Sequence, residues 1–107
     1  MARALVNVPA AARAGDIIEI RTLITHPMET GFRPGPDGKT LPRNIIRRFT
    51  CQYNGEIIFS AALFSAVAAN PFLAFHAVAA KSGTVLCTWE GDDGFSQSES
   101  ATITVLG

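Results

Sequence analysis

Apolar and polar residues alternate along most of the chain, which is the period-two pattern of half-buried β-strands. In the run 16–25, for example, Ile18 and Ile20 alternate with charged residues. Three later runs each place apolar side chains on one face: Phe49, Cys51 and Tyr53; Val85, Cys87 and Trp89; and Ala101, Ile103 and Val105. Helical periodicity is scarce, so the pattern predicts an all-β chain.

Turn-forming residues separate these runs. Asn54-Gly55 supplies the two positive-φ positions of a tight hairpin, and Gly91-Asp92-Asp93-Gly94 is typical of a second hairpin turn. The alanine-rich segment Ala61–Ala69 stays open between a strand and a helical turn. We expect about seven strands: Ala4–Val8, Asp16–Thr25, a strand through Phe49–Tyr53, Glu56–Phe64, Phe72–Ala79, Thr84–Glu90 and a strand through Ala101–Val105. Their number and spacing predict a single immunoglobulin-like β-sandwich domain over residues 1–107.

Two runs depart from the alternation because they are apolar at both parities. They are Ile57, Ile58, Phe59, Ala61, Ala62, Leu63 and Phe64, and then Phe72, Leu73, Ala74, Phe75, Ala77 and Val78. One face of an antiparallel sandwich normally meets water, so apolar residues on both faces suggest a second cover. A partner subunit is the simplest cover, and a loop of the same chain is the alternative.

Composition narrows the class of protein. The 107 residues carry nine basic and nine acidic side chains, so no global charge attracts nucleic acid or an anionic membrane. A hydrophobic content of 48% with 17% charged residues is too apolar for a disordered chain. No apolar run is long enough to span a bilayer. The amino-terminal residues also lack the apolar stretch of a signal peptide, which predicts a cytoplasmic protein or one exported with a partner.

No metal or other cofactor is expected from the candidate ligands. A blue-copper site would draw Cys, His and Met from one late loop, whereas neither His nor Met follows Cys87. Asp92 and Asp93 offer too few oxygen ligands for calcium, and hairpin chemistry accounts for both. His26 precedes Pro27 at a strand end, which is a structural rather than a catalytic position.

The two cysteines allow two interpretations. Cys51 and Cys87 lie mid-strand on apolar faces, where a thiol has a raised pKa and reacts slowly. They could form a disulfide beside Trp89, but free thiols are favoured because Cys51 falls on the third expected strand. A small thiol redox or sulfurtransfer enzyme that uses either cysteine is the rival hypothesis for the function of the chain.

A long loop rich in Pro and Gly, between the strands that hold Leu23 and Tyr53, contains most of the clustered positive charge. Arg33, Arg43 and Arg47 are candidates for an anion-attracting rim near a partner. In a regular strand Arg47 and the next residue, Arg48, point to opposite faces, so we expect them to be separated. The alternative is a solvated strand edge that charges protect from self-pairing.

Several segments, in order, resemble the SoxZ family of thiosulfate oxidation. They are Thr22-Leu23-Ile24-Thr25-His26-Pro27-Met28-Glu29-Thr30-Gly31, Asp37-Gly38-Lys39 with Pro42-Arg43, Phe49-Thr50-Cys51-Gln52-Tyr53-Asn54-Gly55, Ala69-Asn70-Pro71-Phe72, Thr88-Trp89 and Asp92-Asp93-Gly94. The resemblance covers roughly Gly15 to Val105. It implies an immunoglobulin-like subunit that forms a heterodimer with the sulfur carrier SoxY, whose tail cysteine bears the sulfur intermediates.

The resemblance implies a non-enzymatic scaffold without cofactors. It would bind SoxY, dock transiently to the other Sox enzymes, and reach the periplasm folded together with SoxY. The expected partner-binding residues are Phe59, Leu63, Phe64, Phe72, Phe75, Arg33, Arg43 and Arg47. For the isolated chain, a homodimer that covers the same apolar faces stays open as an alternative.

Overall fold

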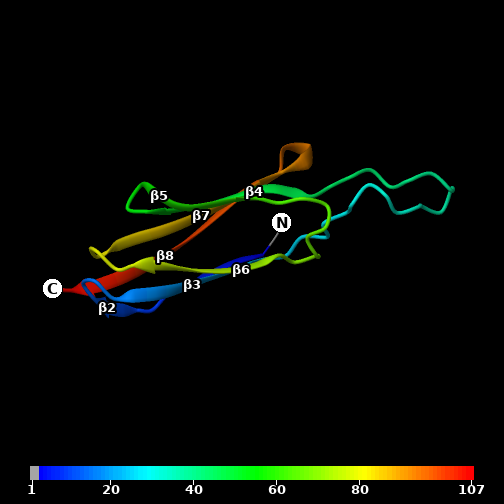
Figure 1. Ribbon diagram of the computed structural model, residues 1–107. Coiled ribbons are helices and arrows are strands. Elements are labelled where there is room, and N and C mark those ends of the chain that lie inside the picture. Colours follow the sequence, from blue (N-terminus) through cyan, green and yellow to red (C-terminus); the bar gives the residue numbers. More distant parts are fainter. Residues whose placement is uncertain (1–2) are drawn as a thin grey trace.

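Two β-sheets packed face to face form the body of the protein in the computed structural model, which describes residues 3–107 (Figure 1). The smaller sheet has the order β1-β3-β6, with β1 at Ala4–Asn7, β3 at Ile17–Ile24 and β6 at Phe72–Val78. The larger has the order β2-β8-β7-β4-β5, with β2 at Ala11–Arg13, β8 at Ser96–Leu106, β7 at Gly83–Gly91, β4 at Ile46–Tyr53 and β5 at Glu56–Ala62. The predicted immunoglobulin-like sandwich is confirmed.

Residues 3–107 form eight strands where about seven were expected, and the additional one is β2. β1 pairs antiparallel with β3, and the chain then crosses to the other sheet, where β2 pairs parallel with β8. Pro9 lies in this crossing, and a proline cannot donate the backbone hydrogen bond that would continue a strand. No helix within residues 3–107 is long and apolar enough to cross a membrane.

The expected turns form as their residues require. Asn54 and Gly55 have φ angles of 51° and 85°, and Tyr53 pairs directly with Glu56 across the hairpin. The short 3-10 turn η1 (Asp92–Gly94) joins β7 to β8. In residues 61–69, where the sequence allowed either a strand or a helical turn, β5 ends and is followed by turns and bends. No helical turn forms in this segment.

An aromatic cluster fills the space between the sheets. Phe49 lies 5.3 Å from Trp89 and 6.0 Å from Phe75, measured between ring centroids. Phe75 from the small sheet stacks on Phe59 from the large sheet, with centroids 4.4 Å apart and planes 7° apart. Stacked and edge-to-face aromatic pairs each add about 1 kcal/mol to the stabilisation from buried area. This cluster therefore joins the two sheets where β5 and β6, the edge strands, approach each other.

The loop between β3 and β4 projects from one end of the sandwich as a long finger (Figure 1). Its two arms are held together by backbone bridges at Glu29–Asn44 and Pro34–Thr40. The molecule is consequently 61 Å long and about 20 Å in its other dimensions, and its radius of gyration is 16.3 Å. A compact chain of this length would have a radius of gyration of about 13 Å.

Candidate partner-binding surfaces

The outer face of the five-stranded sheet is mainly polar, with the exposed Ile57 beside Gln52 at its β5 edge. Its cross-strand rows consist mainly of hydroxyl and amide side chains: Thr50, Thr88 and Ser98 form one row, and Gln52, Leu86 and Ser100 form the next. The hydroxyls of Thr88 and Ser98 are hydrogen-bonded at 2.9 Å. This face carries the polar surface that an antiparallel sandwich presents to water.

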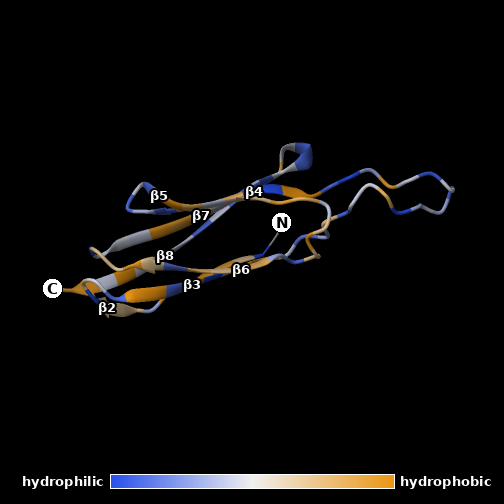
Figure 2. Cartoon of the chain, in the orientation of Figure 1, coloured by the Kyte–Doolittle hydropathy of each residue, from blue (hydrophilic) through white to orange (hydrophobic). Residues whose placement is uncertain are grey.

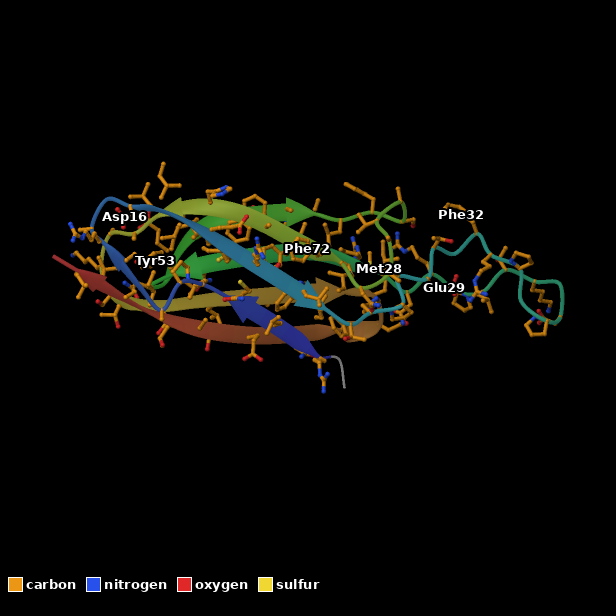
Figure 3. The ribbon with its side chains drawn as sticks, turned by 90° about the horizontal axis from the view of Figure 1, so that it is seen from below. Asp16, Met28, Glu29, Phe32, Tyr53 and Phe72 are labelled. Atoms are coloured by element: carbon orange, nitrogen blue, oxygen red, sulfur yellow. The ribbon has the colours of Figure 1, made fainter. Side chains whose placement is uncertain are left out.

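The outer face of the three-stranded sheet is different. Leu5, Leu23 and Phe72 are register partners across β1, β3 and β6, so their side chains form one row. Their exposed fractions are 54%, 39% and 58%. At the other end of this face Ile17 pairs with Val78, and both are exposed. Between these two apolar ends lie the pairs Glu19–His76 and Arg21–Ala74, and the apolar colour of Figure 2 is accordingly interrupted along β3; Phe72 is labelled in Figure 3.

The phenylalanines and Leu63 that were predicted to bind a partner do not lie on one surface. Some are exposed and others are buried in the core. Phe72 and Phe64 are exposed, whereas Phe59 is half-buried. Phe75 and Leu63 are buried, with exposed fractions of 8% and 6%. The inward parity of β6 points Phe75 into the core, and Leu63 is buried in the turn after β5, so neither is exposed in the folded chain; the partner-binding role predicted for them stays a prediction.

An open groove of about 800 Å³ lies where the finger joins the large sheet. Four predicted residues, Leu63, Phe64, Arg43 and Arg47, come together in its lining, and Phe32, Arg48 and Glu90 also line it. Phe32 and Phe64 are exposed by 80% and 68%, and Phe32 is labelled at the base of the finger in Figure 3. Exposed aromatic rings beside arginines are the composition typical of protein interfaces.

Arg47 and Arg48 line the same groove, which contradicts the expectation that they point to opposite faces. The pairing of β4 with β7 shifts by one residue here, so that Ile46 pairs with Gly91 and Arg48 with Glu90. This β-bulge places two residues opposite one, and both arginines are exposed while the flanking Ile46 is buried.

Two of the predicted cations are neutralised by carboxylates. Arg33 forms a forked pair with Glu29 within the finger, at 2.6 and 3.3 Å. Arg43 donates two hydrogen bonds of 2.9 Å to Asp92, which also accepts the Ile45 N–H at 3.1 Å. The hydrogen bond from Arg43 is the largest cause that lowers the pKa of Asp92. The earlier explanation of Asp92 as a turn residue is therefore incomplete. Its carboxylate also connects the β7–β8 turn to the arm of the finger that leads into β4.

His26 has a structural role in this structure. Its backbone N–H donates to the Asn70 side-chain oxygen at 2.9 Å, and its carbonyl accepts the Asn70 N–H at 2.8 Å. Its Nδ1 accepts the Met28 N–H at 3.0 Å, and its ring packs edge-on against Phe95. Burial is the largest effect on the pKa of His26 and lowers it, while the charge of Asp92 opposes that shift. The backbone of His26 thus joins the start of the finger to the turn before β6, and its ring holds Met28 and packs beside the β7–β8 turn.

Both cysteines are free, fully buried thiols. Cys51 and Cys87 are direct register partners on β4 and β7, so they belong to one sheet and cannot form the bridge between sheets of immunoglobulin domains. A hydrogen bond with Cys51, and then burial, raise the pKa of Cys87. Because neither thiol is accessible to solvent, both are poorly placed to react, which argues against the thiol-enzyme hypothesis. Within residues 3–107, no group of three or more His, Cys, Asp or Glu is placed to hold a metal ion.

The sequence matches the family model of the sulphur oxidation protein SoxZ over residues 6–102. The chain belongs to the SoxZ family. This match covers nearly the whole chain, confirms the resemblance seen in its motifs, and assigns the chain to sulfur oxidation. No curated protein sequence matches it significantly.

Several solved structures share the fold of this SoxZ-family chain. A superoxide reductase (neelaredoxin) from Ignicoccus hospitalis is 16% identical, with a TM-score of 0.75 over 96% of this chain and 80% of that one. The sulfur carrier protein SoxY from Chlorobium limicola f thiosulfatophilum is 10% identical, with a TM-score of 0.67 over 97% and 79%. A putative superoxide reductase from Thermotoga maritima is 16% identical, with a TM-score of 0.70 over 97% and 86%. At these identities the likeness concerns the fold alone.

Sequence reasoning missed several residues of these surfaces. Leu5 and Leu23 join Phe72 only through strand pairing, which the alternation of a single strand does not reveal. Phe32 lies in the finger, where no periodicity exists, and Glu90 lines the groove through its pairing with Arg48. The sequence did contain one signal. In the run 16–25 the residues that alternate with the buried isoleucines include the polar Glu19 and Arg21, and Leu23 is an apolar residue at the same parity.

Proposed function

We propose that this SoxZ-family chain is a non-catalytic scaffold that binds a SoxY-type sulfur carrier as a heterodimer. Its contribution is to hold the carrier and present the sulfur group that the carrier bears to the other Sox enzymes. Like its family's carrier partner, it would work in the periplasm, exported folded with SoxY. The buried state of both thiols supports a role without covalent chemistry on this chain.

The observation that carries the proposal is the contrast between the two outer faces. The large sheet presents mainly hydroxyl and amide side chains, with the exposed Ile57 at its β5 edge, whereas the small sheet presents the exposed row Leu5–Leu23–Phe72. Burying apolar area contributes about 25 cal/mol per Å², so a partner that covers this row gains binding free energy. We therefore assign the SoxY-binding surface to the outer face of β1, β3 and β6.

Light scattering on the chain, alone and mixed with a SoxY-type partner, tests this assignment. A stable one-to-one complex is expected, and Phe72→Asp is expected to weaken it about a hundredfold, because a carboxylate buried without a partner is costly. Phe64→Asp is the matched control, since it alters an equally exposed phenylalanine on the large sheet's side.

Three results would contradict the assignment. A chain that stays monomeric in the presence of SoxY would reject the scaffold function itself. A homodimer that excludes SoxY would assign the apolar row to self-association. A complex weakened by Phe64→Asp but not by Phe72→Asp would move the SoxY-binding surface to the groove.

A further inference from the structure

We propose that the groove at the base of the finger is a second docking surface, which receives an extended acidic segment of another protein while the small sheet holds the carrier. Unlike the SoxY-binding surface, it lies on the side of the large sheet, between the finger, β4 and the turn after β5. The two surfaces use different residues, so the carrier and a second protein can bind together.

The groove is held open by contacts of its own. The Leu63 N–H donates to the Arg47 carbonyl at 2.9 Å, which keeps the turn after β5 beside β4. The Ser65 hydroxyl donates to the Thr30 carbonyl at 3.1 Å and joins this turn to the finger. On the opposite side, Gly91 lets β7 approach the finger's returning arm. A Cβ atom at that position would lie 2.5 Å from the Ile45 carbonyl oxygen.

The hydrogen-bonding capacity of the groove favours an anionic occupant. Its three guanidiniums, from Arg43, Arg47 and Arg48, face two carboxylates, Glu90 in the lining and Asp92 beside it. Arg43 pairs with Asp92, and Arg47 lies only at 4.0 Å from the same carboxylate. Arg48 forms no ion pair with any residue in the described part of the chain. Since each guanidinium has five N–H donors, Arg47 and Arg48 keep most of theirs for carboxylates of a partner.

The apolar part of the groove favours a polypeptide over a small anion. Phe32 and Phe64 rise beside the arginines with exposed fractions of 80% and 68%. A small oxyanion would occupy the arginines and leave both rings in water. A polypeptide segment that alternates acidic and apolar side chains would satisfy the guanidiniums and cover the rings together. Aromatic residues and Arg are also the side chains that contribute most of the binding energy at protein interfaces.

Two synthetic peptides test the proposal with the full chain, one alternating Glu with Leu and the other alternating Lys with Leu. Binding is measured by fluorescence anisotropy at several salt concentrations and mapped by backbone amide shifts in NMR spectra. We expect only the Glu peptide to bind, with shifts confined to the bulge of β4, the turn after β5 and the part of the finger that lines the groove. Replacing both Arg47 and Arg48 with Ala is expected to weaken binding about tenfold. Arg21→Ala, an exposed arginine on the small sheet, is the matched control.

Equal binding of the two peptides, or an affinity for the Glu peptide that the double replacement leaves unchanged, would overturn the proposal. So would binding of the chain to anionic phosphatidylglycerol vesicles in place of the Glu peptide, since that would make the groove a membrane contact. The Arg47→Ala/Arg48→Ala chain is also mixed with SoxY. We expect the heterodimer to persist, and its loss would show that the groove belongs to the carrier interface and is no second surface.

Discussion

The sharpest stability prediction concerns Phe75, which the sequence pattern could not separate from Phe72. Phe75 is 8% exposed, stacks on Phe59 at 4.4 Å and contacts Phe49 across the sandwich. A buried phenylalanine removes at least about 150 Å² from water, worth about 4 kcal/mol at 25 cal/mol per Å². Because Ala retains one carbon of the side chain, we expect Phe75→Ala to lower the free energy of unfolding by about 3–4 kcal/mol.

Urea denaturation of the isolated chain, followed by circular dichroism, measures this loss. With an m-value of about 1.5 kcal/mol per M, the midpoint should fall by about 2 M. Phe72→Ala is the matched control, and its loss should stay below about 1 kcal/mol because the ring is 58% exposed. If Phe75→Ala does not fold, Phe75→Leu supplies a smaller loss of about 1 kcal/mol. Equal losses for the two phenylalanines would refute the assignment of Phe75 to the core.

Two further predictions follow from the buried and paired titratable groups. Cys51 and Cys87 should resist a thiol reagent at neutral pH in the native state and react only after denaturation; fast native labelling would restore the thiol-enzyme hypothesis. The folded pKa of Asp92 is lowered from its ordinary value of 3.8, so its stabilisation is complete above about pH 4 and is lost as the pH falls through the folded value. Unfolding free energies measured from neutral to acidic pH should show this loss in the parent chain and less of it in Asp92→Asn.

The fold was largely predictable because its signals are local. Alternation in the run 16–25 and the Asn54-Gly55 turn both depend on neighbouring residues, and the structure confirms each. β2 escaped prediction because three residues, Ala11–Arg13, carry no readable period and are held by parallel pairing with the distant β8.

The site was less predictable because its geometry is set by contacts between distant segments. A run that is apolar at both parities does not say which parity faces the core, so Phe75 and Phe72 could not be separated. The β-bulge that brings Arg47 and Arg48 together depends on the pairing of β4 with β7. Likewise, Asp92 binds Arg43 from a segment 49 positions away.

The position of Trp89 gives this protein a built-in optical reporter. It is the only tryptophan in the chain, it is fully buried, and its indole N–H has no hydrogen-bond partner within residues 3–107. An indole in such dry surroundings emits at shorter wavelength than one in water, so its emission maximum should shift when the sheets separate. Because the Trp89 side chain is fully buried between the sheets, its emission reports chiefly on the integrity of the core, even though the next two residues, Glu90 and Gly91, line the groove. Fluorescence can therefore distinguish a variant that has lost its partner from one that has lost its fold.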